Sequence, residues 1–235
     1  MVQPSKAMTK RFLLMPLLFF ALSTYSQELS QVTFSGGATL SSFSFITDQK
    51  VVIRIAEDGR VLEWGTDPGT GRYNYYTGKL QPYLGRVDYY GQSEFDSVLR
   101  GKVKSIGTCS LKYYGAFETK SKIGKLRSVG SVALDYYNTY ENTINQGKLK
   151  SAGYITFDYY SSSENEAFRS KLKAVGNTQI TYYSTFDDKV IKGKIKSIGS
   201  FTYEWYSSHD RREFQGALKS GPTTQNINGV TYVLR

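Results

Sequence analysis

Residues 131–153 read SVALDYYNTYENTINQGKLKSAG, and residues 154–176 read YITFDYYSSSENEAFRSKLKAVG. The two stretches align without a gap, and the same 23-residue pattern continues on both sides of them. Five gapless blocks occupy 108–130, 131–153, 154–176, 177–199 and 200–222. A period of this length indicates a repeat architecture, in which each block is one small structural unit. The chain is therefore expected to contain one repeat domain.

Two further blocks extend the array toward the N-terminus. The block at 84–107 follows the pattern with one extra residue, and a degenerate copy lies near 59–83. In the degenerate copy, 61–64 matches the segment 201–205, so Trp64 and Trp205 occupy the same repeat position. The predicted array therefore has about seven units and spans 59–222.

Each block contains two segments with the pattern of β-strands. Apolar and polar residues alternate through 132–137 and again through 147–153, which is typical of half-buried strands. No proline interrupts 84–221, as a continuous hydrogen-bonded ladder requires. A glycine recurs at 130, 153, 176 and 199, either as the positive-φ residue of a hairpin turn or as a bend within one longer strand. We favour hairpins, and predict an all-β fold with one antiparallel sheet, extended or solenoid-like.

The segments that flank the array are predicted to be β caps at its two ends. The segment 49–64 reads as a hairpin around Asp58-Gly59, and 226–235 reads as a strand pair turning at Asn228-Gly229. Terminal units of repeat arrays are usually atypical because they cover exposed ends. We therefore expect an N-terminal β cap over 27–58 and a C-terminal capping strand over 223–235.

The repeat also resembles known bacterial repeats. The run Gly-Lys-Leu-Lys-Ser at 147–151, followed by a paired tyrosine at a period near 23, resembles MORN-type β-hairpin repeats. It is also similar to YD-type repeats, in which a Gly-Lys/Arg-Leu segment pairs with a Tyr-rich strand. The resemblance covers roughly 59–222. It implies an array of hairpins with an interaction or structural role.

The N-terminus has the layout of a secretory signal peptide over 1–26. Lys6, Lys10 and Arg11 precede an apolar run at 12–22, and small residues follow before Gln27. An uncleaved N-terminal anchor is the alternative interpretation. The protein is expected to be exported, and to be periplasmic, on the cell surface or secreted.

Composition excludes several classes of function. The 235 residues include 30 Lys+Arg against 20 Asp+Glu, one Cys and one His. A single Cys excludes an internal disulfide framework and a Cys-based zinc cage, and Cys109 is expected to be a small buried apolar residue. His209 occupies a position where other blocks have an aromatic residue, so it is interpreted as an aromatic substitute. No catalytic motif and no cofactor-binding motif is present, so no enzyme activity and no cofactor are predicted.

Charged residues recur in two rows. One acid and, nine residues later, one base occur in each block: Glu118, Glu141, Glu164, Asp187 and Asp210, with Arg127, Lys150, Lys173, Lys196 and Lys219. Five equivalent acids do not fit a catalytic pair, which needs two carboxyl groups in different environments. We expect an electrostatic ladder that fixes the strand register.

The paired tyrosines are the most unusual feature of the sequence. Adjacent strand residues point to opposite faces, so one aromatic column is expected in the core and the other on an exposed face beside lysines. That second column either packs across strands or forms a binding surface. The candidate binding residues are Tyr114, Tyr137, Tyr160, Tyr183 and Tyr206, with Lys150, Lys173 and Lys196.

The expected partners follow from charge and compartment. A cell-envelope glycan or anionic polymer suits aromatic residues beside cations, and another protein is the alternative partner. Nucleic acid is not expected, because acids alternate with the lysines and export removes the protein from most nucleic acid. Open sheet ends are also free to pair edge to edge with a second copy. A glycan-active enzyme and a small outer-membrane β-barrel are the alternative functions.

Overall fold

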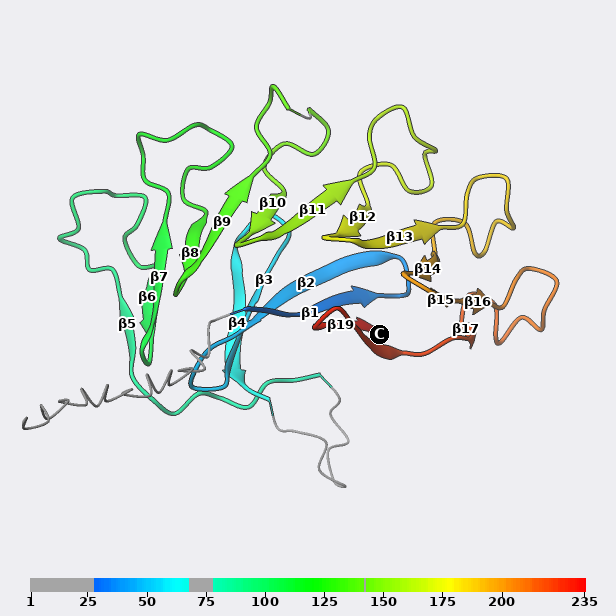
Figure 1. Ribbon diagram of the computed structural model, residues 1–235, viewed down its shortest axis with the longest axis horizontal. Helices are drawn as coiled ribbons and strands as arrows, with labels where there is room; N and C mark the ends of the chain where they lie inside the picture. Colours follow the sequence, from blue (N-terminus) through cyan, green and yellow to red (C-terminus); the bar gives the residue numbers. More distant parts are fainter. Residues whose placement is uncertain (1–27, 68–77, 142) are drawn as a thin grey trace, which may run out of the picture.

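A computed structural model describes residues 28–67, 78–141 and 143–235. These residues form nineteen strands and no helix, which confirms the predicted all-β class (Figure 1). The predicted signal segment 1–26 lies outside the described residues.

Six strands from the two flanks of the chain form one sheet, here called the inner sheet. Its order is β18-β19-β1-β2-β3-β4, and all neighbours are antiparallel except β1 and β19, which are parallel. The strands are β1 (Glu28–Ser35), β2 (Thr39–Ile46), β3 (Val51–Ile55), β4 (Val61–Thr66), β18 (Thr224–Ile227) and β19 (Val230–Leu234). The inner sheet therefore joins both flanks of the array.

Eleven consecutive strands form an antiparallel sheet, here called the repeat sheet, that runs from β5 to β15. They are β5 (Val87–Tyr89), β6 (Val103–Ile106), β7 (Cys109–Tyr113), β8 (Leu126–Val129), β9 (Val132–Tyr136), β10 (Leu149–Ala152), β11 (Ile155–Tyr159), β12 (Leu172–Val175), β13 (Thr178–Tyr182), β14 (Ile195–Ile198) and β15 (Phe201–Thr202). A two-stranded sheet of β16 (Glu204–Trp205) and β17 (Leu218–Ser220) follows. Figure 1 shows the strands of the repeat sheet fanning out, with long loops along the outer rim.

Alternation and glycine determine the local structure of the repeat sheet. In β9, Val132, Leu134 and Tyr136 are buried while Ala133 is exposed, as expected for a strand with one face in a core. Gly130, Gly153, Gly176 and Gly199 have φ between 53° and 59° at tight turns between antiparallel strands, where a side chain would be strained.

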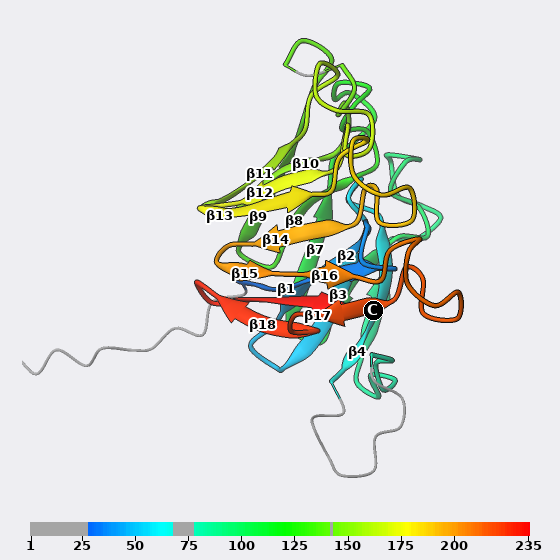
Figure 2. The ribbon, with the colours of Figure 1, turned by 90° about the vertical axis from the view of Figure 1, so that its right-hand side faces the viewer.

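The two sheets share one hydrophobic core. Apolar residues of the inner sheet, including Phe34, Phe43 and Ile53, are buried in the same cluster as Leu134, Phe157 and Ile180 of the repeat sheet. The rings of Phe43 and Phe157 meet with their centroids 4.5 Å apart. In the turned view, the last strands of the repeat sheet lie beside β1 and β19 (Figure 2). The fold is therefore a two-layer β-structure.

This arrangement differs from the predicted caps in two respects. The flanks do not cover opposite ends of the array separately. Instead, β1 and β19 pair with each other, and their apolar residues pack in the core against the repeat sheet. In addition, β4 belongs to the inner sheet and β16 and β17 form a separate two-stranded sheet, so the predicted array of 59–222 is divided among three sheets. Both differences have one cause: each sheet has an apolar face that is removed from water only by the other sheet.

Candidate functional site

A recurring β-bulge positions the predicted basic residues. Asp135 pairs with Ser151 but Tyr136 pairs with Leu149, so Lys150 is an extra residue in its strand. The same register shift leaves Arg127, Lys173, Lys196 and Lys219 as extra residues, and Lys104 in the first strand pair. A bulge redirects a side chain out of the regular ladder. We call Lys104, Arg127, Lys150, Lys173, Lys196 and Lys219 the basic row.

Each member of the basic row lies over the ring of a second-column tyrosine. The ring centroids of Tyr90, Tyr114, Tyr137, Tyr160, Tyr183 and Tyr206 are 5.2–5.9 Å from the cationic groups. These are favourable cation–π distances. The structure therefore brings the predicted tyrosines and lysines together, one pair at a time, at the rim of the repeat sheet.

The tyrosine hydroxyl groups link successive units. Tyr90, Tyr114, Tyr137, Tyr160 and Tyr183, here called the tyrosine ladder, donate hydrogen bonds of 2.9–3.2 Å to main-chain carbonyls 20 or 21 residues further along. Burial, with the nearby Asp158, raises the pKa of Tyr137 to about 12, so the hydroxyl remains a donor. Four of the five predicted binding tyrosines therefore also have a structural role.

The predicted acid–base ladder is confirmed in two units. Glu141 pairs with Lys150, and Glu164 Oε1 lies 3.3 Å from Lys173 Nζ. The bond from Lys150 lowers the pKa of Glu141. Asp187 and Asp210 instead accept hydrogen bonds from the main-chain N–H and hydroxyl groups of Ser184 and Ser207, which closes the start of each loop.

The outer face of the repeat sheet, which points away from the inner sheet, carries a shallow groove of about 900 Å³. It crosses β7 to β10, and its lining includes Tyr90, Lys112, Tyr114, Arg127 and Asp135. Lys112 and Arg127 are exposed, and neither forms an ion pair within the described part of the chain. The groove therefore presents two free positive charges beside aromatic rings.

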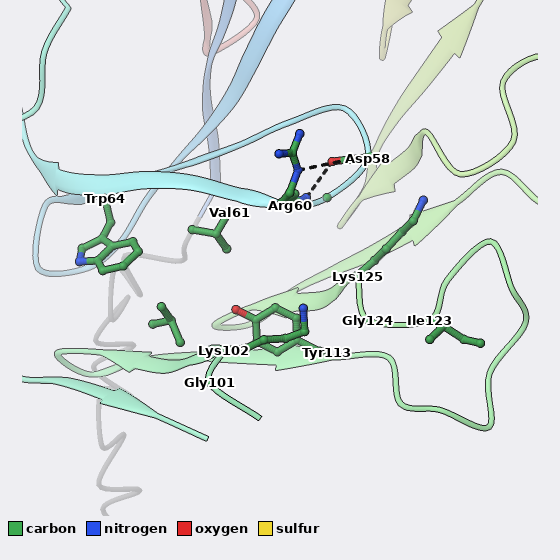
Figure 3. A pocket seen from close by; sticks show the side chains of 12 residues that line it. Asp58, Arg60, Val61, Trp64, Gly101, Lys102, Tyr113, Ile123, Gly124 and Lys125 are labelled. Carbon is green, nitrogen blue, oxygen red and sulfur yellow. Dashed lines mark hydrogen bonds and ion pairs between the residues drawn. The ribbon is translucent and has the colours of Figure 1, made fainter. Parts of the chain in front are cut away.

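A second cavity, of about 360 Å³, lies between the inner sheet and the start of the repeat sheet, and is here called the Trp64 cleft. Figure 3 shows Trp64 and Val61 projecting from β4 toward Lys102 and Tyr113 on the opposite side. Asp58, Arg60 and Lys125 also line the cleft, and Arg60 Nε lies 3.6 Å from Asp58 Oδ2. Burial raises the pKa of Tyr113, so its hydroxyl remains protonated.

The sequence-based site did not include the Trp64 cleft or a second row of lysines, Lys102, Lys125, Lys148, Lys171 and Lys194, called the inner lysine row. Its period of 23 residues was visible, because each of its members follows a glycine or, in one unit, a serine. What the sequence did not show is that Trp64, on a strand of the other sheet, would face the first member of this row.

Comparison with known proteins finds no match among family models, curated proteins or solved structures. Within the described residues, no three His, Cys, Asp or Glu side chains gather as a metal site would require. Those residues also form no helix long and apolar enough to cross a membrane.

Proposed function

We propose that the chain is an exported, non-catalytic β-repeat protein with a binding or structural role in the cell envelope. Its ligand is a glycan or anionic polymer that lies along the outer face of the repeat sheet and contacts the basic row. The 23-residue blocks are interpreted as hairpin units of a MORN-type or YD-type array, supported by strand starts at Cys109, Val132, Ile155 and Thr178.

The outer-face groove is the observation that carries this proposal. Lys112 and Arg127 are the cations that line it, and neither is neutralised by a carboxylate within the described residues. The floor includes small polar residues such as Ser128 and Ser151, which leave room for a ligand. An anionic chain placed there gains charge-assisted hydrogen bonds without displacing an existing ion pair.

Spacing favours an extended ligand. Equivalent residues of successive units are two strands apart, which corresponds to roughly 10 Å in a sheet. The basic row therefore presents one cation and one ring per step along the sheet, and a polymer with a regular repeat meets the same pair at each step. Each member of the basic row recurs beside a tyrosine ring, which suits repeated binding better than acid–base catalysis by two unlike groups.

A binding screen with glycans and anionic envelope polymers tests the proposal. The double variant Lys112→Gln/Arg127→Gln is expected to weaken binding at least about tenfold, since each charged contact contributes about 1.5–3 kcal/mol. The control Lys120→Gln/Lys189→Gln removes the same charge from exposed loop lysines outside the groove. Equal binding by the two double variants, or no polymer bound by the wild type, would contradict the proposal.

A further inference from the structure

The first member of the inner lysine row differs from the other four. The Nζ atoms of Lys148, Lys171 and Lys194 donate hydrogen bonds of 2.5–2.9 Å to the carbonyls of Ser170, Gly193 and Gly36, and Lys125 donates to Gly147. The ammonium of Lys102 lies 5.3 Å from the ring centroid of Tyr113. Within the described residues it has no hydrogen bond and no ion pair. One positive charge of this row is therefore free.

The aromatic residue beneath each lysine of the inner lysine row shows the same difference. Tyr136 and Tyr182 donate hydrogen bonds of 2.7 and 2.9 Å to the carbonyls of Leu126 and Leu172. Trp205 Nε1 donates to Ile195 over 2.7 Å. The hydroxyl of Tyr113 makes no such bond to any residue that the structure describes. Tyr159 is also unpaired, but it is enclosed in the core, whereas Tyr113 borders an open cleft.

Both free donors line the Trp64 cleft, together with the apolar side chains of Val61 and Val103. Because Trp64 comes from the inner sheet and Lys102 from the repeat sheet, a ligand here would contact both layers (Figure 3). A cavity with an aromatic wall and a few unpaired polar groups is the usual form of a small-molecule site.

A related cleft at the other end of the repeat sheet shows the same arrangement with its donors already hydrogen-bonded to carbonyls of the chain. It has a volume of about 280 Å³ and is lined by Lys194 and Trp205, which are four repeats beyond Lys102 and Tyr113. There the corresponding donors are bonded to the carbonyls of Gly36 and Ile195. In the Trp64 cleft, the donors at the same repeat positions, Lys102 and Tyr113, form no hydrogen bond with any residue that the structure describes.

We propose that the Trp64 cleft binds a sugar ring that carries a carboxylate group. The carboxylate accepts hydrogen bonds from Lys102, a ligand oxygen accepts one from the Tyr113 hydroxyl, and the flat C–H face of the ring packs on Trp64. A purely apolar ligand would leave both donors unpaired on burial, which is unfavourable. The other charged groups of the lining already have partners, because Arg60 pairs with Asp58 and Lys125 donates to the carbonyl of Gly147. The ammonium of Lys102 is therefore the charge left to meet the carboxylate of a sugar acid. Tyr113 lines both cavities, but Lys102 and Trp64 line only the Trp64 cleft and Lys112 and Arg127 line only the groove, so the two proposals are tested by different residues.

Tryptophan fluorescence tests this proposal, because the chain has only two tryptophans. Titration of the full chain with glucuronate is expected to change the emission saturably, and Trp64→Phe is expected to remove that change. Lys102→Gln should weaken glucuronate binding at least about tenfold, and neutral glucose should bind at least about tenfold more weakly than glucuronate. Tyr113→Phe removes one unpaired hydroxyl, so it should weaken binding and leave thermal stability unchanged.

The outer-face variant Lys112→Gln/Arg127→Gln serves as the matched control and should bind glucuronate like the wild type. Loss of polymer binding in that variant with retained glucuronate binding separates the two sites. The proposal is overturned if glucuronate produces no saturable change, if glucose binds equally well, or if Lys102→Gln binds like the wild type while calorimetry shows the same folded state.

Discussion

The indole ring of Trp205 packs directly against Gly37, so that a Cβ added to this glycine would overlap the six-membered ring. Gly37 lies in the β1–β2 turn with φ of 65°, and its carbonyl accepts a 2.7 Å hydrogen bond from Ile195 N. The β3–β4 turn has the same relationship to the repeat sheet, with Gly59 against Tyr136 and Glu57 O bonded to Leu149 N over 2.7 Å. Through these contacts and hydrogen bonds, the two turns attach the inner sheet to the repeat sheet.

Gly37→Ala is therefore expected to be destabilising through two effects, the positive φ and the overlap with Trp205. Gly36→Ala is the matched control, because Gly36 has φ of 58° and a Cβ added to it would have no atom within 4 Å. Overpacking typically costs about 1–3 kcal/mol, so Gly37→Ala should lose that much more stability than Gly36→Ala. Urea unfolding measures both variants, and equal losses would show that the ring contact is unimportant.

Burial between the sheets leads to a second prediction. Phe157→Ala removes a fully buried ring that contacts Phe43, and should cost about 3–5 kcal/mol. Phe186→Ala removes a ring that is 94% exposed at a loop tip, and should change stability by less than about 0.5 kcal/mol. Because both sheets share one core, thermal unfolding of Phe157→Ala should remain a single transition. Two separate transitions would contradict the shared core.

The sequence predicted the features that depend on neighbours in the chain. Alternation in 132–137 and the recurring glycines are local signals, and they predicted the strands and the all-β class. The pairing of β1 with β19 joins Phe34 to Leu234, and no local pattern encodes a contact at such a separation. The flanks were therefore predicted as separate caps.

The candidate site shows the same limit. Lys150 and Tyr137 were predicted to share a face, and they do lie together. The two strands that carry them are neighbours in the chain and pair directly, so their arrangement follows from short-range sequence signals. Lys102 and Lys125 have the same preceding residue, yet only Lys125 finds a carbonyl acceptor. The repeat pattern does not show that difference, because it gives both lysines an equivalent glycine 22 residues further along.

The tyrosine ladder leads to a third prediction. Tyr183→Phe removes the 2.9 Å hydrogen bond to the carbonyl of Tyr203 and should cost about 0.5–1.5 kcal/mol. Tyr206→Phe is the control, because its ring also has a lysine above it but its hydroxyl has no partner among the described residues. Denaturant unfolding should show a loss for Tyr183→Phe alone. Equal stability of the two variants would mean that the inter-unit bond contributes nothing.

The Glu141–Lys150 pair leads to a prediction about pH. The hydrogen bond from Lys150 lowers the pKa of Glu141 below its ordinary value of 4.5. A carboxyl group with a lowered pKa stabilises the folded state above its ordinary pKa, and this contribution disappears as the pH falls through the lowered value. Lys150→Gln should therefore raise the pKa of Glu141 toward 4.5 and weaken the loss of stability on acidification.

An NMR titration of the Glu141 carboxyl group measures this shift directly. Lys173→Gln is the matched control, because Lys173 pairs with Glu164 in the next unit and should leave the titration of Glu141 unchanged. If Glu141 titrates identically in the wild type and in Lys150→Gln, the pair does not exist in solution. Lys150 would then be held by the ring of Tyr137 alone, and it would be as free to bind an anionic ligand as Arg127.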